Sequence, residues 1–79
     1  MKRLTTKEIF ETMTDIRNGL NNYKRVSLDL SNDVAIEVEI KNDKFELNII
    51  DSDTGITEMT IGSYDYLDEA GFQLAKMFL

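Results

Sequence analysis

The sequence contains no cysteine, no histidine, no tryptophan and no proline. Without cysteine the chain can form neither a disulfide nor a thiolate metal site. Without histidine it lacks the commonest general base and the commonest protein metal ligand. No run approaches the roughly 20 apolar residues that a membrane-spanning helix needs, and the first residues lack the apolar region of a signal peptide. We therefore expect a cytoplasmic protein with no membrane partner.

The charge of the chain is unevenly distributed. Fifteen acidic and nine basic residues give a net charge of −6 over 79 residues. Residues 1–25 hold six bases and three acids, for +3, whereas residues 26–79 hold three bases and twelve acids, for −9. Such a chain should be repelled by nucleic acid and attracted to basic surfaces. The simpler alternative is that acidity keeps a small protein soluble.

Alternation of apolar and polar residues dominates residues 25–49 and predicts three strands with one buried face. Leu30 is expected opposite Val34, which places Arg25 opposite Glu39 on the other face, and residues 42–43 suit a two-residue hairpin turn. The positions expected to face inward are Val26, Leu28, Leu30, Val34, Ile36, Val38, Ile40, Phe45, Leu47 and Ile49.

Helices are expected at both ends of the chain. Thr5 and Glu8 fit a capping box that begins the first helix, whose apolar stripe is Ile9, Met13, Ile16 and Leu20. Residues 56–61 predict a weaker fourth strand that Gly62 ends, with Met59 and Ile61 facing inward. Ser63 or Asp65 is expected to cap the last helix, in which the small residues 70–71 would let the helix lie close to the sheet.

These elements predict an α+β fold made of a single domain, residues 1–79. It has an N-terminal helix, a three- to four-stranded antiparallel meander sheet and a C-terminal helix, in the order α-β-β-β-β-α. Both helices are expected on one face of the sheet. The other face would be left open and would carry Asp29, Glu37, Glu39, Glu46 and Glu58.

The available side chains support little catalysis. Glu37, Glu39 and Glu46 could suggest paired carboxylates or a weak divalent-cation site, but a flat sheet face provides no cleft. Residues 51–55 begin like a calcium loop without completing its pattern, so a hairpin turn is the better interpretation. We therefore expect a protein that is not an enzyme and has no catalytic residue, metal or cofactor. A small carboxylate enzyme is the least favoured alternative.

The helix–sheet–helix order is similar to that of the double-stranded-RNA-binding domain, which presents basic residues at the start of its last helix. Here the segment 63–69 holds three acids and no base. The charge has the wrong sign, so direct nucleic-acid binding is not expected.

In size, charge and α/β order, the whole chain resembles small phage inhibitors of the anti-CRISPR and anti-restriction type. No motif carries this resemblance, so no functional residue is transferred by it. It implies a protein that imitates the charge of DNA and occupies the nucleic-acid-binding groove of a nuclease. Acids in the turns, including Asp51 and Asp53, could imitate phosphates, and Tyr64 and Tyr66 could add contact area.

The leading hypothesis is therefore an inhibitor that occupies a basic, nucleic-acid-binding surface on a host defence enzyme. Its expected contact residues are Asp29, Glu37, Glu39, Glu46, Glu58, Asp51, Asp53, Tyr64 and Tyr66. An interface confined to the turns or to the last helix fits almost as well. The alternative is a self-associating accessory module, in which apolar residues left over by the helices, such as Phe10 and Phe72, would form a homodimer rather than a monomer.

Overall fold

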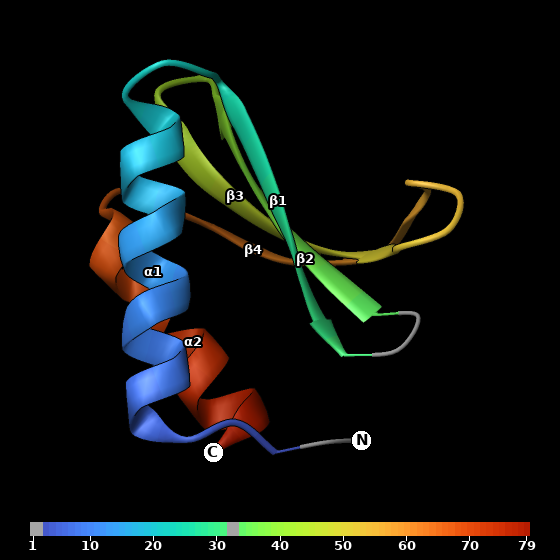
Figure 1. Ribbon diagram of the computed structural model, residues 1–79. Helices are drawn as coiled ribbons and strands as arrows, with labels where there is room; N and C mark the ends of the chain where they lie inside the picture. Colours follow the sequence, from blue (N-terminus) through green and yellow to red (C-terminus); the bar gives the residue numbers. More distant parts are fainter. Residues whose placement is uncertain (1–2, 32–33) are drawn as a thin grey trace.

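The computed structural model of the protein describes residues 3–31 and 34–79 (Figure 1). Its elements are α1 (Thr6–Leu20), β1 (Arg25–Ser31), β2 (Val34–Lys41), β3 (Lys44–Asp51), β4 (Thr57–Tyr64) and α2 (Leu67–Phe78). The four strands form one antiparallel sheet in the order β1-β2-β3-β4. Both helices lie on the same face of this sheet (Figure 1), so the predicted α+β meander is confirmed.

The start of α1 is fixed by its capping box. The Thr5 hydroxyl accepts a hydrogen bond from the Glu8 amide at 3.1 Å, and the Glu8 carboxylate accepts one from the Thr5 amide at 3.0 Å. Each bond satisfies an amide that the helix itself leaves without a partner. From this start, the spacing of Ile9 and Ile16 turns both side chains into the core.

The β2–β3 hairpin has the turn that the sequence predicts. Asn42 and Asp43 have positive φ angles of 53° and 62°, a conformation that asparagine and aspartate tolerate better than other residues with a side chain. This two-residue turn sets the register, which places Ile40 opposite Phe45 and Glu39 opposite Glu46 as predicted.

The β1–β2 register is correct over most of its length and wrong at one end. Arg25 lies opposite Glu39, as predicted, but Ser31 rather than Leu30 lies opposite Val34. A bulge between Asp29 and Ser31 inserts the extra residue. The rest of the predicted turn, residues 32 and 33, lies outside the described residues.

The end of β4 also differs from the prediction. Gly62 does not end the strand; it pairs with Leu47, and β4 continues in register to Tyr64. Two register shifts interrupt the pairing of β3 and β4 before Gly62. A side chain at Gly62 would place its Cβ 2.8 Å from the Tyr64 hydroxyl oxygen, so the Tyr64 ring would have to move to make room for it.

Neither Ser63 nor Asp65 caps α2. The N-cap is Tyr66, whose amide donates to the Glu69 carboxylate at 3.2 Å. Asp65 instead accepts a hydrogen bond from Lys44 Nζ at 2.9 Å, which raises the pKa of Lys44. The contact ties the β2–β3 turn to the start of α2.

The core lies between the helices and the inner face of the sheet. Ile16, Ile36, Val38 and Leu47 are completely buried there. Leu4, which the sequence pattern did not single out, is also buried, and its amide donates to the Phe78 carbonyl at 2.6 Å, joining the start of α1 to the end of α2. In the part of the chain that the structure describes, no helix is long and apolar enough to cross a membrane.

The two helices pack closely because of a glycine. A Cβ at Gly71 would lie 3.3 Å from Cγ of Met13 on α1. Gly71 therefore allows close contact between α1 and α2, while its neighbour Ala70 is completely buried in the core.

Candidate interaction surfaces

A polar network centred on Asn48 occupies the outer face of the sheet. Asn48 is 2% exposed, and its amide nitrogen donates to Glu37 Oε1 and Glu46 Oε1, each at 3.2 Å. Its carbonyl oxygen accepts from the Thr60 hydroxyl at 2.8 Å. A carboxylate can only accept, so the two glutamates fix the orientation of the amide.

Hydrogen bonds and one ion pair occupy part of the predicted acidic cluster. Arg25 lies opposite Glu39 in the register, but its Nε is 3.6 Å from Glu37 Oε2 on the diagonal. Glu37 is only 8% exposed, while Glu39 and Glu46 are half-buried. The centre of the outer face therefore offers a partner little free carboxylate, Glu37 least of all.

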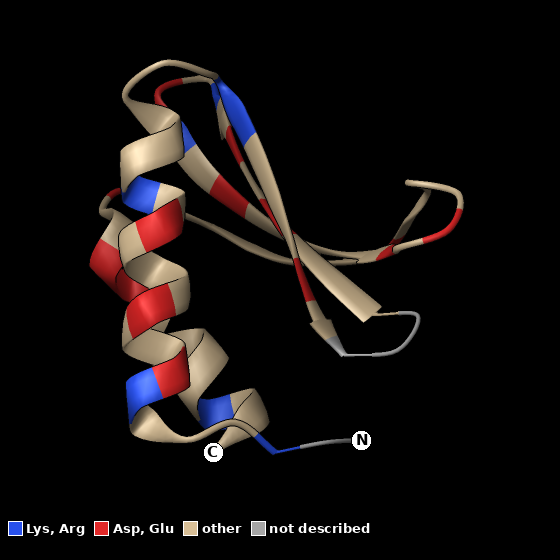
Figure 2. Cartoon of the chain, in the orientation of Figure 1, with Lys and Arg blue, Asp and Glu red and all other residues tan. Residues whose placement is uncertain are grey.

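Four other predicted residues lie towards one end of the sheet. Asp29 pairs with Ala35, whose other neighbour Ile50 pairs in turn with Thr57, so this end is a row that crosses all four strands from β1 to β4. We call this surface the acidic end; it consists of Asp29, Asp51, Asp53 and Glu58. Figure 2 shows the acids there, beyond the helices, whereas the basic residues of the strands lie at the opposite end of the sheet.

Asp51 shapes the β3–β4 turn at the acidic end. One carboxylate oxygen accepts from the amides of Asp53 at 2.8 Å and Thr54 at 3.1 Å, an arrangement typical of aspartate in turns. Gly55 follows with a φ of +72°. The hairpin-turn prediction is confirmed, and no group of three or more acidic side chains among the described residues is arranged to hold a metal ion.

Two exposed apolar side chains accompany these acids. Ile56 is 66% exposed and Met59 is 54% exposed. Met59 pairs with Ile49, a residue of the core cluster, as its predicted inward position requires. The helices do not cover this end of the sheet (Figure 1), so Met59 stays open to solvent. The alternating pattern identified its face but not its exposure.

The two tyrosines have different environments. Tyr64 pairs with Phe45 and packs against the core, and burial together with the nearby Glu69 raises the pKa of its hydroxyl. Tyr66 is 72% exposed at the start of α2. Tyr66 therefore offers much more surface to a partner than Tyr64.

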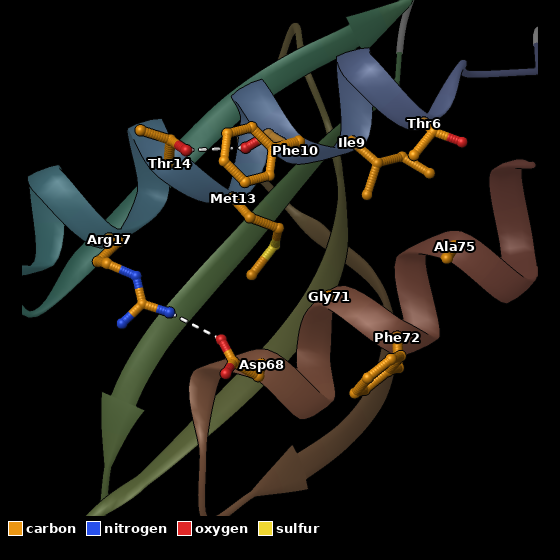
Figure 3. A pocket seen from close by; sticks show the side chains of 10 residues that line it. All are labelled: Thr6, Ile9, Phe10, Met13, Thr14, Arg17, Asp68, Gly71, Phe72 and Ala75. Atoms are coloured by element: carbon orange, nitrogen blue, oxygen red, sulfur yellow. Dashed lines mark hydrogen bonds and ion pairs between the residues drawn. The ribbon is translucent and has the colours of Figure 1, made fainter.

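A groove between α1 and α2 forms a second surface, with a volume of about 440 Å³. Phe10 on α1 and Phe72 on α2 stand at its two sides, 72% and 70% exposed (Figure 3). Its lining residues are Thr6, Ile9, Phe10, Met13, Thr14, Arg17, Asp68, Gly71, Phe72 and Ala75. The sequence predicted that the core would leave Phe10 and Phe72 uncovered, but it did not reveal the groove between them.

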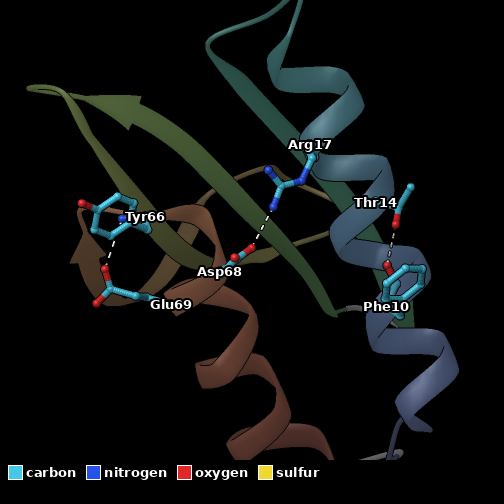
Figure 4. Close-up of polar contacts among 6 residues, drawn as sticks. All are labelled: Phe10, Thr14, Arg17, Tyr66, Asp68 and Glu69. Atoms are coloured by element: carbon cyan, nitrogen blue, oxygen red, sulfur yellow. Dashed lines mark hydrogen bonds and ion pairs between the residues drawn. The ribbon is translucent and has the colours of Figure 1, made fainter.

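Polar groups in the groove are largely occupied. Arg17 Nη2 lies 2.7 Å from Asp68 Oδ1 and bridges the two helices at one end (Figure 4). The Thr14 hydroxyl donates to the Phe10 carbonyl at 2.9 Å within α1. The groove is therefore mainly apolar, with an ion pair at one end.

Comparison with known proteins found no protein family, no curated protein and no solved structure that matches this chain. The fold and the two surfaces define a small α+β domain with an acidic sheet end and an apolar helix groove.

Proposed function

We propose that this protein is a non-catalytic inhibitor that occupies a basic, nucleic-acid-binding surface on a host defence enzyme. It would act in the cytoplasm of that host, in the manner of the anti-CRISPR and anti-restriction proteins that it resembles. The observation that carries the proposal is the acidic end, where four carboxylates lie away from the basic residues of the strands.

The acidic end is a better contact surface than the centre of the outer face. Among the described residues, no cation lies within ion-pair distance of Asp29, Asp53 or Glu58, and all three side chains are exposed. They can meet arginine or lysine without breaking an internal contact. Glu37, by contrast, would first have to leave Asn48 and Arg25.

Ile56 and Met59 add the apolar part that a specific interface needs. Charged contacts mainly speed association and select the partner, whereas desolvated apolar anchors supply much of the affinity. A basic groove with an apolar patch on its wall would complement this surface. Because the contact relies on exposed charges, binding should weaken as the salt concentration rises.

The test is inhibition of DNA cleavage by a panel of purified RNA-guided nucleases and restriction endonucleases. We expect the protein to inhibit at least one of them at low salt. The triple variant Asp29→Asn, Asp53→Asn, Glu58→Gln should inhibit that enzyme about 10- to 100-fold less well, since each lost charge pair is worth roughly 0.5–1 kcal/mol.

The matched control carries the same change in net charge elsewhere. The variant Glu11→Gln, Asp15→Asn, Asp43→Asn alters three exposed acids outside the acidic end and should inhibit like the parent protein. Equal losses in both variants would mean that net charge alone matters, and equal retention would remove the acidic end from the interface. A parent protein that inhibits none of the enzymes would contradict the proposed function.

A further inference from the structure

We propose that the α1–α2 groove is the contact surface of a homodimer, with a second copy of this chain as its occupant. The proposal does not depend on the inhibitory function, because the groove and the acidic end are separate surfaces. Three properties of the groove support it: its apolar area, its self-complementary shape and the charges at its two ends.

The exposed phenylalanines make a large apolar surface for a domain of this size. A phenylalanine side chain buries about 150–250 Å² when fully covered, and Phe10 and Phe72 leave about 70% of their area open. Four such rings in a dimer would bury on the order of 500 Å², before the groove walls are counted. Small stable interfaces need roughly 1,200 Å² in total, so the groove supplies a substantial part.

The groove also has the shape that a two-fold contact requires. In such a contact the same patch meets itself, so each copy must offer both a protrusion and a recess. Phe72 protrudes on α2, and Gly71 and Ala75 beside it carry almost no side chain (Figure 3). Met13 packs against Gly71, so a phenylalanine of the second copy can enter the groove beside Ala75, while the groove of that copy receives Phe72.

The charges at the ends of the helices favour a second copy over an unrelated helix. The two helices run in opposite directions, since the start of α1 is bonded to the end of α2. One end of the pair carries Arg3, Lys7 and Lys76 beside Glu8 and Glu11, for a net charge of +1. The other end carries Asp15, Asp68 and Glu69 beside Arg17, which pairs with Asp68, for a net charge of −2. A two-fold axis across the helices sets the lysine end of one copy against the acidic end of the other.

Other charges near these ends have contacts of their own. Glu8 at the lysine end accepts from the Thr5 amide, and Glu11 lies 3.9 Å from Lys7. A partner helix of uniform charge would meet repulsion at one end of the groove, whereas in the antiparallel second copy each end faces an end of opposite net charge.

Sedimentation velocity of the full chain over about 1–500 µM tests this proposal. We expect a concentration-dependent rise to twice the 9.1 kDa mass of the chain. The variant Phe10→Ser, Phe72→Ser should weaken dimerisation at least tenfold, because it removes the protrusions of both copies. Both side chains are exposed, so thermal unfolding should remain close to that of the parent.

The matched control removes two equally exposed large side chains outside the groove. Tyr23→Ser, Ile56→Ser changes residues that are 69% and 66% exposed, and this variant should still dimerise. A parent that stays monomeric over the whole range would overturn the proposal. So would a dimer that the control variant loses and the groove variant keeps, because the contact would then lie elsewhere.

A single introduced thiol gives a second, independent measurement. The chain has no cysteine, so Thr14→Cys would place its one thiol at the groove, and Thr57→Cys would place it on β4. Under mild oxidation we expect disulfide-linked dimers to form faster at position 14 than at position 57. Equal rates would contradict the proposal. If the chain is monomeric and the groove variant loses nuclease inhibition, the groove binds a different protein and the dimer proposal is wrong.

Discussion

Replacing Asn48 with aspartate should destabilise the domain by about 3–5 kcal/mol at pH 7, the range found when a buried charge loses its partner. The amide of Asn48 is the donor shared by Glu37 and Glu46. A carboxylate in its place would leave three negative charges together at a site that is 2% exposed. Urea unfolding of the two proteins at the same pH measures the difference.

The loss of stability should depend on pH. Burial and the neighbouring carboxylates would raise the pKa of the new carboxyl group in the folded state above its unfolded value near 4. The folded state would then hold its proton more tightly than the unfolded state. The loss of stability is therefore fully present at pH 7 and should shrink as the pH falls towards 4. It is measured by comparing the variant with its parent at each pH.

Two further variants locate the cause of the effect. Asn42→Asp makes the same chemical change in the exposed β2–β3 turn and should alter stability by no more than about 0.5 kcal/mol. Adding Glu37→Gln to Asn48→Asp restores an amide donor beside the new carboxylate and should recover part of the loss. If Asn48→Asp behaved like Asn42→Asp, the network would have no structural importance.

Shortening Ile36 to alanine should cost about 2–5 kcal/mol, as large-to-small changes in cores do. Ile36 is completely buried in β2, where it pairs with Leu28 on one side and Ile49 on the other. The backbone of a central strand cannot close the cavity, because two neighbouring strands hold it. In a domain this small, each kcal/mol lowers the melting temperature by roughly 4–8 °C.

Ile56 provides the matched comparison for this change. It is the same residue type, 66% exposed, so Ile56→Ala should change the free energy of unfolding by less than about 0.5 kcal/mol. Calorimetry of both variants measures the two effects. Similar losses in the two proteins would contradict the assignment of the core to the inner face.

The fold was predictable where short-range sequence patterns determine the structure. Alternation identifies the inner face of β1, β2 and β3, and the residues of the β2–β3 turn set the register between two of them. The bulges after Asp29 and within β4 were not predictable, because an inserted residue alters pairing without altering composition. The extension of β4 through Gly62 depends on pairing with residues 45–47 of β3, which only the folded sheet determines.

The candidate site was predictable in composition but not in arrangement. All nine predicted contact residues were chosen for charge or aromatic character. Their burial depends on neighbours, and Glu37 becomes buried because Asn48 and Arg25 approach it from two different strands. The period-two pattern assigns Asn48 to the outer face. It does not indicate that Asn48 is the most buried polar residue of that face. The groove depends on the distance between two helices far apart in sequence, which no local pattern records.

The meander topology has a consequence for the order in which the protein folds. Each strand pairs with its neighbour in sequence, so the sheet forms through short loop closures, which are fast. The α1–α2 contact instead joins segments from opposite ends of the chain, as in the Arg17–Asp68 pair. We therefore expect amides of β2 and β3 to gain protection in pulse-labelled hydrogen exchange before those of α2. The groove would then be completed last, so that dimerisation selects fully folded chains.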